Sequence, residues 1–519
     1  MKTLKQTDLQ IPCERKSVRQ NNLQILQRNY FCGRITLAEI FKQMPTKDFR
    51  LTCGLEIHVR LASATKLFCN CSNETFAAEP NSHVCPVCMA FPGALPVVNE
   101  SAVHLGVKLA LALGCKIAQS SRFDRKSYFY PDLPAGFQIS QFFQPIAENG
   151  QVEFFNNGEK KSVRINRLHL ENDAGKLVHA GKNSLVDLNR AGSPLAEIVT
   201  EPDFEDPQDV FEFLKNLQRI CRFCKASQAD MEKGQMRCDV NISVRKKDQQ
   251  ELGVKVEIKN MNSFANARKA VEFEFARQAK LLSRGERIHQ QTRGFNAEKG
   301  TTHAQRSKEE SADYRYFPEP DLPAVQISEK QIAQIRAQLP TLPAARLERF
   351  LSEFALPLEQ AETLADDLAL ADFFENANAV ANNPRKTANW ILGEFLQHLK
   401  SEGLTCENCK MSPESLGKLV QVVESGQISG KIAKEIFPEI FKSGADPEQF
   451  CRERNLVQLQ DTGEIQQLCQ EVCQESPQIV ADFKNGKTKA MGALVGLVMK
   501  KSQGKANPKL VNQVLQQML

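Results

Sequence analysis

The stretch Gly-Leu-Glu-Ile-His-Val at residues 54–59 sets the fold class. A repeat of two places Glu56 and His58 on one face of a strand and the aliphatic side chains on the other. Such a strand belongs to a sheet with a core on one side and solvent or a ligand on the other. The stretch therefore predicts a half-buried strand whose polar face carries a carboxylate and an imidazole.

Three further stretches repeat this pattern: residues 167–173, 238–243 and 255–259. Their polar faces would carry, among others, Glu171, Asp173, Asp239 and Glu257. One such strand usually means only a solvated face, but four of them predict a sheet that lines a cleft. Carboxylates with one imidazole suit Mg²⁺ or Mn²⁺, and Mg²⁺ often adds substrate phosphates to one or two carboxylates.

The order of these elements predicts an α+β fold around a mainly antiparallel sheet. A few helical stretches occur in the first part, with clear periodicity at 102–113 and 207–223, while strand signals vanish after Pro343. Two all-helical units follow, separated by a polar linker at 402–410. The expected divisions are a leader at 1–48, a sheet domain at 50–342, a helical domain with linker at 343–410, and a helical tail at 411–519.

The basic charge of the chain is concentrated in its first fifty residues. The net charge is +5, whereas residues 1–50 hold ten Lys/Arg against four Asp/Glu, so the remainder carries −1. The leader has no continuous apolar segment, and Arg28-Asn29-Tyr30-Phe31 resembles a matrix-peptidase context, which predicts a mitochondrial transit peptide and a matrix location. The alternative is a disordered basic tail, because Asp8 and Glu14 are unusual in transit peptides. No apolar run approaches the ~20 residues of a membrane span, so membrane insertion is not expected.

Four of the sixteen cysteines form two close pairs. Cys69 and Cys71 are followed by Cys85 and Cys88, and four thiolates at such spacing suit a closed tetrahedral Zn²⁺ site of structural type. The first pair is one residue tighter than the common knuckle, so four unliganded thiols are the alternative. The other cysteines are expected to be reduced thiols in small apolar sites.

Three loops rich in Gly, Pro, Asn and Arg lie between the strands, at 129–132, 188–194 and 313–318. Their arginines and aromatics suit phosphate, adenine and ribose, which makes Tyr130, Asn189, Arg190 and Arg315 candidates for nucleotide contacts. A Walker A loop does not compete, because Ala481 stands where the first glycine before Gly486-Lys487-Thr488 would be.

The end of the chain has no acid after Asp482 but accumulates lysines. Lysine runs are usually solvated faces, but a cluster on an otherwise neutral protein predicts contact with a phosphate backbone. The candidates are Lys484, Lys487, Lys489, Lys500, Lys501, Lys505 and Lys509. A glutaminase site is not evident, since neither Cys53 nor Cys115 has the glycines of a nucleophile elbow.

Several long strings resemble one family, GatB. Beside 54–59 these are 92–99 (Pro-Gly-Ala-Leu-Pro-Val-Val-Asn), 123–132 (Phe-Asp-Arg-Lys-Ser-Tyr-Phe-Tyr-Pro-Asp), 188–195 (Leu-Asn-Arg-Ala-Gly-Ser-Pro-Leu), 237–243 (Arg-Cys-Asp-Val-Asn-Ile-Ser), 313–323 (Asp-Tyr-Arg-Tyr-Phe-Pro-Glu-Pro-Asp-Leu-Pro) and 504–508 (Gly-Lys-Ala-Asn-Pro). The match runs from about residue 50 to 519. Arg125, Lys126 and Arg237 lie in these strings and complete the set of expected nucleotide contacts.

The resemblance implies a glutamine-synthetase-like cradle, a helical domain and a tail similar to YqeY proteins. It also implies a reaction in which ATP phosphorylates the γ-carboxylate of Glu-tRNA(Gln) and ammonia then displaces the phosphate. Ammonia would arrive through a tunnel from a glutaminase, the A subunit of a heterotrimer that also contains a small C subunit. Carried onto this sequence, the favoured Mg²⁺ ligands are Glu56, His58, Glu171 and Glu257, with Asp173 and Asp239 as second choices.

Two departures limit the transfer. Asn172 stands where bacterial relatives often have an acid, and the leader is foreign to them. Two other functions stay open from the residues alone. One is a ligase acting on a free small acid, against which the basic tail argues. The other is a zinc scaffold that binds tRNA without catalysis, against which the carboxylate–histidine strands argue.

Overall fold

The computed structural model describes residues 46–307, 313–454, 456, 462–484, 486–502 and 506–519. The predicted leader lies outside these residues except for a 3-10 turn, η1 (Thr46–Asp48), that precedes the first strand. Within the described part, no helix combines the length and the apolar character needed to cross a membrane.

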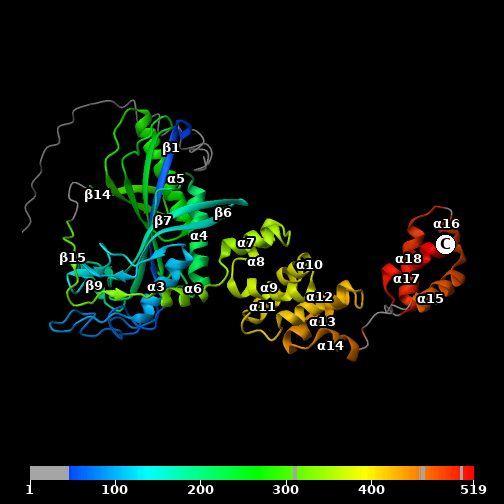
Figure 1. The fold of residues 1–519 in the computed structure, drawn as a ribbon. Coiled ribbons are helices and arrows are strands. Elements are labelled where there is room, and N and C mark those ends of the chain that lie inside the picture. The colour runs from blue at the N-terminus through cyan, green and yellow to red at the C-terminus, as the bar shows by residue number, and fades with distance from the viewer. Residues whose placement is uncertain (1–45, 308–312, 455, 457–461, 485, 503–505) are drawn as a thin grey trace, which may run out of the picture.

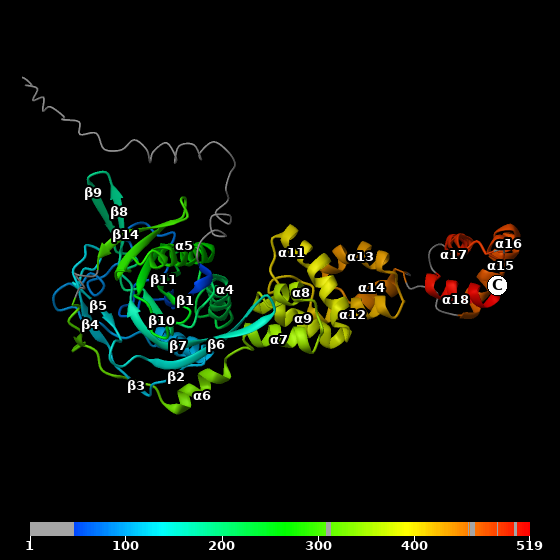
Figure 2. The ribbon, with the colours of Figure 1, turned by 90° about the horizontal axis from the view of Figure 1, so that it is seen from above.

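A nine-stranded sheet forms the first part of the chain (Figures 1 and 2), in the order β14-β13-β12-β11-β1-β10-β7-β6-β2. Neighbouring strands are antiparallel except for the parallel pair β12–β13. The bounds are β1 Phe49–Arg60, β2 Lys116–Ile117, β6 Ala147–Asn156, β7 Glu159–Asn172, β10 Pro194–Thr200, β11 Met236–Lys246, β12 Val256–Met261, β13 Gln291–Asn296 and β14 Thr301–Ser307. The predicted α+β class with a mainly antiparallel sheet is confirmed, and all four predicted polar-faced strands join this sheet.

The apolar face of the sheet packs against three helices, α3 (Glu100–Ala112), α4 (Pro207–Phe223) and α5 (Phe264–Ser283). Helix α4 has the bounds that the periodicity predicts, because Asp206 caps its first turn and Pro207 occupies N1. Ile57, between Glu56 and His58, is fully buried in this core. The helices therefore cover one face, and the polar face is left open for the site.

Three small sheets arrange loops at the rim of the large one. β15 (Phe317–Pro318), β4 (Asp124–Ser127) and β5 (Phe137–Ser140) form the first. β16 (Val325–Gln326) pairs with β3 (Ser120–Ser121), and β8 (Lys176–Ala180) with β9 (Asn183–Asp187). Pairing of Phe317 with Arg125 brings the predicted loops at 123–132 and 313–318 together although they are far apart in sequence.

The rest of the described chain is helical (Figure 1). Its buried side chains form two apolar cores. The first helix, α6 (Glu329–Ala337), still packs on the sheet domain. The middle elements are α7 Pro343–Ser352, α8 Leu358–Leu364, α9 Leu368–Ala381, α10 Pro384–Trp390, η3 Ile391–Phe395, α11 Leu396–Glu402, α12 Pro413–Glu424, α13 Gly430–Ser443 and α14 Pro447–Glu453. The tail holds α15 Thr462–Glu475, α16 Pro477–Lys484, α17 Lys489–Lys501 and α18 Pro508–Met518.

The division between the helical units differs from the one expected at 410/411. One core runs from Leu347 to Cys451, and the predicted linker packs on it through Leu404, Cys406 and Cys409. The next core begins at Ile465. The polar composition of 402–410 reflects a tight turn between helices of a single core, because local polarity does not reveal which helices share a core.

Candidate functional site

Two histidines and two glutamates meet on the polar face at the centre of the sheet. β1, β10 and β7 are neighbours, and their register sets His58 opposite Glu197 and Glu197 opposite His169. His58 Nε2 lies 3.3 Å from Glu171 Oε1 and 3.4 Å from Glu197 Oε2. His169 Nε2 lies 3.1 Å from Glu197 Oε2. We call these four residues the carboxylate–histidine cluster.

The cluster is largely removed from water, and its charges depend on one another. Burial alone would lower the pKa of His58, but hydrogen bonds and charge from Glu171 and Glu197 outweigh it and raise that pKa to about 10. Burial opposes ionisation of Glu197, yet the adjacent His169 and His58 hold its pKa well below the usual range. Two buried carboxylates thus attract positive charge to one point, which protons on the imidazoles or a metal cation can supply.

The donor atoms of this cluster suit a metal ion. One ligand atom each of His58, Glu171 and Glu197 lies within 4.8 Å of the others. Glu171 is 2% exposed, and its Oε2 has no hydrogen-bond partner within the described residues. A buried carboxylate oxygen without a donor is costly unless something else satisfies it. Oxygen ligands with one imidazole are a set that Mg²⁺ and Mn²⁺ accept.

The remaining predicted ligands line the same cleft without joining this group. Glu56 accepts a hydrogen bond from Asn241 Nδ2 at 2.8 Å. Glu257 accepts one from Thr292 at 2.8 Å and lies 3.1 Å from Lys259 Nζ. The structure therefore brings together His58 and Glu171 of the favoured set. Glu56 lies two residues from His58 on β1, and Glu257 lies two strands away on β12.

The two second choices are held by cations. Asp173 is buried and bonds Arg237 Nη2 at 2.8 Å, and Asp239 bonds Lys259 Nζ at 2.5 Å. Each of these carboxylates thus has a cationic partner without a metal, although Asp173 Oδ2 accepts no hydrogen bond within the described residues and lies 3.4 Å from Arg190 Nε. Asn172 is structural at this point, since its Oδ1 accepts the Ile139 N–H at 2.7 Å.

A cleft of about 910 Å³ opens over these residues. Its floor is the polar face of the sheet, and Lys126 of β4 and the loop residues Tyr128 and Tyr314 reach it from the rim. Arg237, Lys255 and Lys259 supply further positive charge to its lining. Carboxylates and cations that line one cleft fit a phosphorylated ligand held by a metal ion and by side chains together.

The predicted nucleotide contacts fall into two groups. Lys126 and Arg237 line the cleft, whereas the others do not. Arg125 is ion-paired with Glu319 and Asp321, and Arg190 donates to the carbonyls of Ala174 and Gly175. The side chains outside the cleft include Asn189, which is buried and hydrogen-bonded to His83 and Glu79, and Tyr130 and Arg315, which are exposed on loops.

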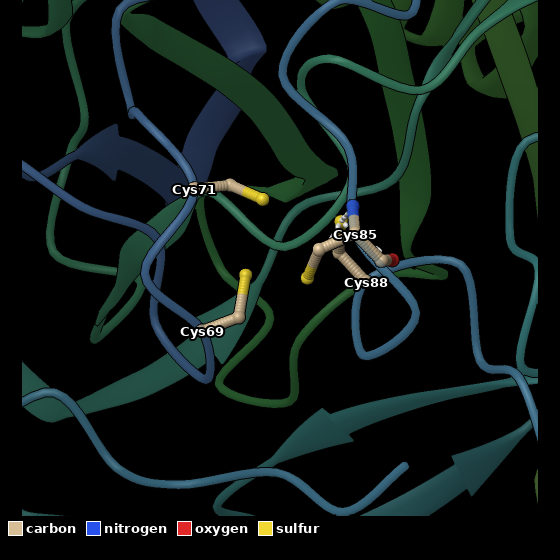
Figure 3. A group of neighbouring side chains, drawn as sticks. All are labelled: Cys69, Cys71, Cys85 and Cys88. Carbon is tan, nitrogen blue, oxygen red and sulfur yellow. Dashed lines mark hydrogen bonds between the residues drawn. The ribbon is translucent and has the colours of Figure 1, made fainter.

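The four cysteines of the predicted zinc site converge from two loops (Figure 3). The four Sγ atoms, those of Cys69, Cys71, Cys85 and Cys88, all lie within 4.8 Å of one another. The Sγ atoms of Cys85 and Cys88 are 3.9 Å apart, close to the ~3.8 Å that a tetrahedron with Zn–S of ~2.3 Å requires. The donor set therefore fits a closed, structural metal site.

A fully buried lysine lies against this cysteine group. Lys66 Nζ is 3.5 Å from Cys88 Sγ and 2.7 Å from the carbonyl of His83. A hydrogen bond from Cys69 and the charge of Lys66 lower the pKa of Cys88 to about 4. Gly192 (φ +90°) closes the packing, since a Cβ there would lie 3.3 Å from the Lys66 side chain and 3.5 Å from Cys88. Buried lysines are rare unless their charge is compensated. A negatively charged thiolate at Cys88 compensates the charge of Lys66 and so accounts for its burial.

The predicted tail lysines differ in their partners. Lys487 pairs with Asp482, and Lys501 with Glu471 and Glu475. Lys505 lies outside the described residues. The ammonium groups that remain exposed, with no ion pair in the described part of the chain, are those of Lys484, Lys489, Lys500 and Lys509.

Sequence reasoning missed Glu197 and did not single out His169. Strand β10 reads Pro-Leu-Ala-Glu-Ile-Val-Thr, so its nearly continuous apolar character predicts a buried strand, not a site. The signal that could have found Glu197 is its isolation as the single carboxylate of that strand. An unpaired charge in a central strand needs a partner.

Comparison with known proteins shows the family of this chain. The GatB/GatE catalytic domain model matches residues 51–333, and a GatB domain model matches 372–519. The B subunit of the aspartyl/glutamyl-tRNA(Asn/Gln) amidotransferase of Carboxydothermus hydrogenoformans is 47% identical over 478 residues, covering 91% of this chain and 99% of the relative. The proteins of the same name from Persephonella marina and Thermotoga maritima are 48% and 46% identical, each over 91% of this chain and at least 99% of the relative. On these matches, and with its carboxylate-lined sheet and helical tail, the chain belongs to the GatB/GatE family of amidotransferase subunits.

Proposed function

We propose that this chain amidates tRNA-bound glutamate, converting Glu-tRNA(Gln) into Gln-tRNA(Gln). It would do so as the B subunit of a heterotrimer whose other members are a glutaminase (the A subunit) and a small C subunit. The observation that carries the proposal is the carboxylate–histidine cluster at the bottom of a cleft lined with cations, in a chain of this family. The named relatives act on both Asp-tRNA(Asn) and Glu-tRNA(Gln), so Asp-tRNA(Asn) is a second candidate substrate.

The reaction needs activation because a carboxylate is a poor acceptor for an amine. In the first step a γ-carboxylate oxygen attacks the γ-phosphorus of ATP, the bond to the β-phosphate oxygen breaks, and ADP leaves. In the second step ammonia attacks the acyl carbon, phosphate departs with the bonding electrons, and the amide forms. The ammonia nitrogen loses a proton, which a cleft carboxylate such as Glu56 or Glu257 can accept.

The cleft residues divide this work by charge. Lys126, Arg237 and Lys255 line the cleft and suit phosphate oxygens. His58, Glu171 and Glu197 would hold a divalent cation, and that ion would neutralise the transferred phosphoryl group. The half-buried Tyr128 and Tyr314 limit the entry of water, which would otherwise hydrolyse an acyl phosphate.

The test is reconstitution of the chain with its two partner subunits, followed by assay of Glu-tRNA(Gln) amidation with ATP and glutamine. Asp-tRNA(Asn) is assayed in parallel. With ammonia withheld and hydroxylamine added, an acyl phosphate should be trapped as the γ-hydroxamate of glutamate only when ATP is present. Amidation without ADP formation, or no trapped hydroxamate, would contradict the two-step route.

Glu171→Gln removes charge from the cluster while nearly keeping its shape, and Glu251→Gln on the exposed loop before β12 is the matched control. Glutamine hydrolysis by the glutaminase partner should continue in both variants. Amidation should be lost in the first and kept in the second.

We also propose a structural Zn²⁺ at Cys69, Cys71, Cys85 and Cys88, supported by the Sγ separations and the compensating ammonium of Lys66. Elemental analysis of protein purified without chelator should give about one zinc per chain. Absence of zinc would leave four ordinary thiols.

The proposed location is the mitochondrial matrix, for which the basic leader of residues 1–48 is the support. The test is import of the chain into isolated mitochondria, followed by N-terminal sequencing of the product. A chain that is neither imported nor shortened would contradict this address.

A further inference from the structure

A group of aromatic rings adjoins the cleft, and neither the metal site nor the phosphate contacts use it. Phe142 stacks on Tyr316 with ring centroids 4.1 Å apart and an interplanar angle of 15°. Phe143 meets Phe142 edge-on at 5.1 Å, and Tyr314 meets Tyr316 edge-on at 6.2 Å. We call Phe142, Phe143, Tyr314 and Tyr316 the aromatic rim.

The rim is held in place although it faces solvent. The buried carboxylate of Asp124 accepts the backbone N–H groups of Phe142 at 2.8 Å and Phe143 at 3.0 Å. Arg167 donates to the carbonyl of Phe142 at 3.2 Å, and its guanidinium lies 5.5 Å from the Phe142 ring centroid. Phe142 is nevertheless 39% exposed and Phe143 58%. Apolar rings that are both fixed and exposed are typical of binding surfaces.

The rim lies beside the carboxylate–histidine cluster. Tyr314 lines the cleft, with the Lys126 ammonium 5.0 Å above its ring. Arg167 is on β7, two residues before His169 and therefore on the same face. Tyr316 packs against Tyr314, with ring centroids 6.2 Å apart, which joins the rest of the rim to the cleft. A ligand on the rim can therefore have its reacting end in the cleft.

We propose that the aromatic rim stacks the adenine base of an adenosine whose reacting group lies in the cleft. Flat aromatic faces suit nucleobases, and Arg167 and Lys126 beside them suit the attached phosphates. The inference rests on the proposed function, in which two ligands carry an adenosine: ATP, and the 3′-terminal nucleotide of the aminoacyl-tRNA. A protein partner fits less well, because interface cores are depleted in charge whereas cations and carboxylates surround this rim.

The experiment uses Phe143→Ala in the reconstituted heterotrimer, because this exposed ring can be removed without opening the core. Phe76→Ala is the matched control, since Phe76 is 64% exposed and also has a lysine, Lys233, 5.6 Å from its ring, away from the cleft. Loss of one stacked base should raise one KM by roughly five- to a hundredfold, while kcat changes little. Phe143→Tyr keeps an aromatic ring at this position, so its KM should stay at the wild-type value.

The two sources of adenine give different results. A higher KM for ATP, with weaker discrimination against GTP, assigns the rim to the nucleotide. A higher KM for Glu-tRNA(Gln), together with weaker inhibition by the trinucleotide CCA, assigns it to the tRNA end. Unchanged KM values for both, or equal effects in Phe76→Ala, would overturn the inference. Dissociation of the heterotrimer on size exclusion would overturn it in favour of an interface with a partner protein. The wild-type heterotrimer is assayed in parallel. If it amidates Glu-tRNA(Gln), a negative result for Phe143→Ala counts against the aromatic rim and not against the proposed function.

Discussion

The cleft and the tail both concentrate charge, but they hold it in opposite ways. In the cleft, His58, Glu171 and Glu197 are mostly buried and lie within hydrogen-bond range of one another. In the tail, Lys484 and Lys489 lie exposed on or beside short helices, and their charges meet water. Burial makes each charge in the cleft depend on its neighbours, whereas solvent screens each charge in the tail from the next.

This contrast in burial governs how each region can act. A preorganised, partly dehydrated cluster can stabilise charge that appears only in a transition state, so it affects kcat. Exposed ammonium groups contact a phosphate backbone equally before and during reaction, so they affect binding. The predictions that follow test this contrast, starting with the largest expected effect.

Removal of one cluster carboxylate should have the largest effect. Glu171→Gln should lower kcat for amidation by a hundredfold or more, which corresponds to about 3 kcal/mol of transition-state stabilisation. Glu257→Gln should lower it as well, because Glu257 lines the same cleft. The two variants should differ in metal affinity, since only Glu171 lies in the cluster. Binding of Mn²⁺, followed by electron paramagnetic resonance, measures that difference, and equal affinities in both variants would contradict the assignment of the cluster.

Loss of one cysteine should remove the zinc. Cys88→Ser should reduce zinc from about one equivalent to none and lower the melting temperature, because binding at a structural site contributes to folding free energy. Ser227→Ala, a buried substitution outside the four-cysteine group, is a control for general destabilisation. A Cys88→Ser protein that keeps its full zinc content would disprove the four-cysteine site.

Lys66 provides an intermediate case, a single buried charge that lies outside the cleft. Lys66→Met keeps much of the volume but removes the ammonium beside Cys88 Sγ. Thiolates at the site then lose their compensating charge, so zinc affinity should fall by about tenfold or more, the range for partners of metal ligands. Competition with a colorimetric zinc chelator measures it. Unchanged affinity would mean that Lys66 only donates hydrogen bonds to the carbonyls of His83 and Leu188.

Removal of exposed tail lysines should change binding but not chemistry. Changing Lys484, Lys489 and Lys500 to Ala should raise the KM for Glu-tRNA(Gln) with kcat largely intact. The slope of log affinity against log salt should shrink by about 0.7–0.9 per lysine. A matched control replaces three exposed lysines that are ion-paired in the middle helices, Lys418, Lys434 and Lys442. Equal slopes in both triple variants would show that the tail lysines only keep a helical surface solvated.

The smallest effect is expected where an exposed charge serves only local structure. Asp446 caps α14, accepting from the N–H groups of Glu448 and Gln449, and bonds Lys418 Nζ at 2.5 Å. The Lys418 hydrogen bond and these N–H groups lower the pKa of Asp446. Its stabilisation is therefore present above the ordinary pKa of 3.8 and is lost as pH falls through the lowered value. Asp446→Ala should weaken α14 by about 1 kcal/mol near pH 7. Hydrogen exchange of the α14 amides should show this difference at neutral pH and lose it in strong acid.

Residues that are close together in the chain were enough to predict which elements form and which way their side chains point. A repeat of two predicted that Glu56 and His58 share a face, and it predicted the polar faces around Glu171 and Glu257. The bounds of α4 at 207–223 and the spacing of the four cysteines were also readable, because these features depend on short-range relations along the chain. Local rules suffice for such features.

The choice of neighbouring strands, in contrast, is made by the packing of the whole domain. Glu197 joins His58 because β10 lies between β1 and β7, a pairing that strand periodicity does not encode. The same pairing leaves Glu257 two strands away from β1, beside Lys259. The aromatic rim likewise forms only when the loops around Phe142 and Tyr316 meet. Strand order depends on how helices and sheets bury their apolar faces together, so contacts between residues distant in sequence are fixed by the core as a whole.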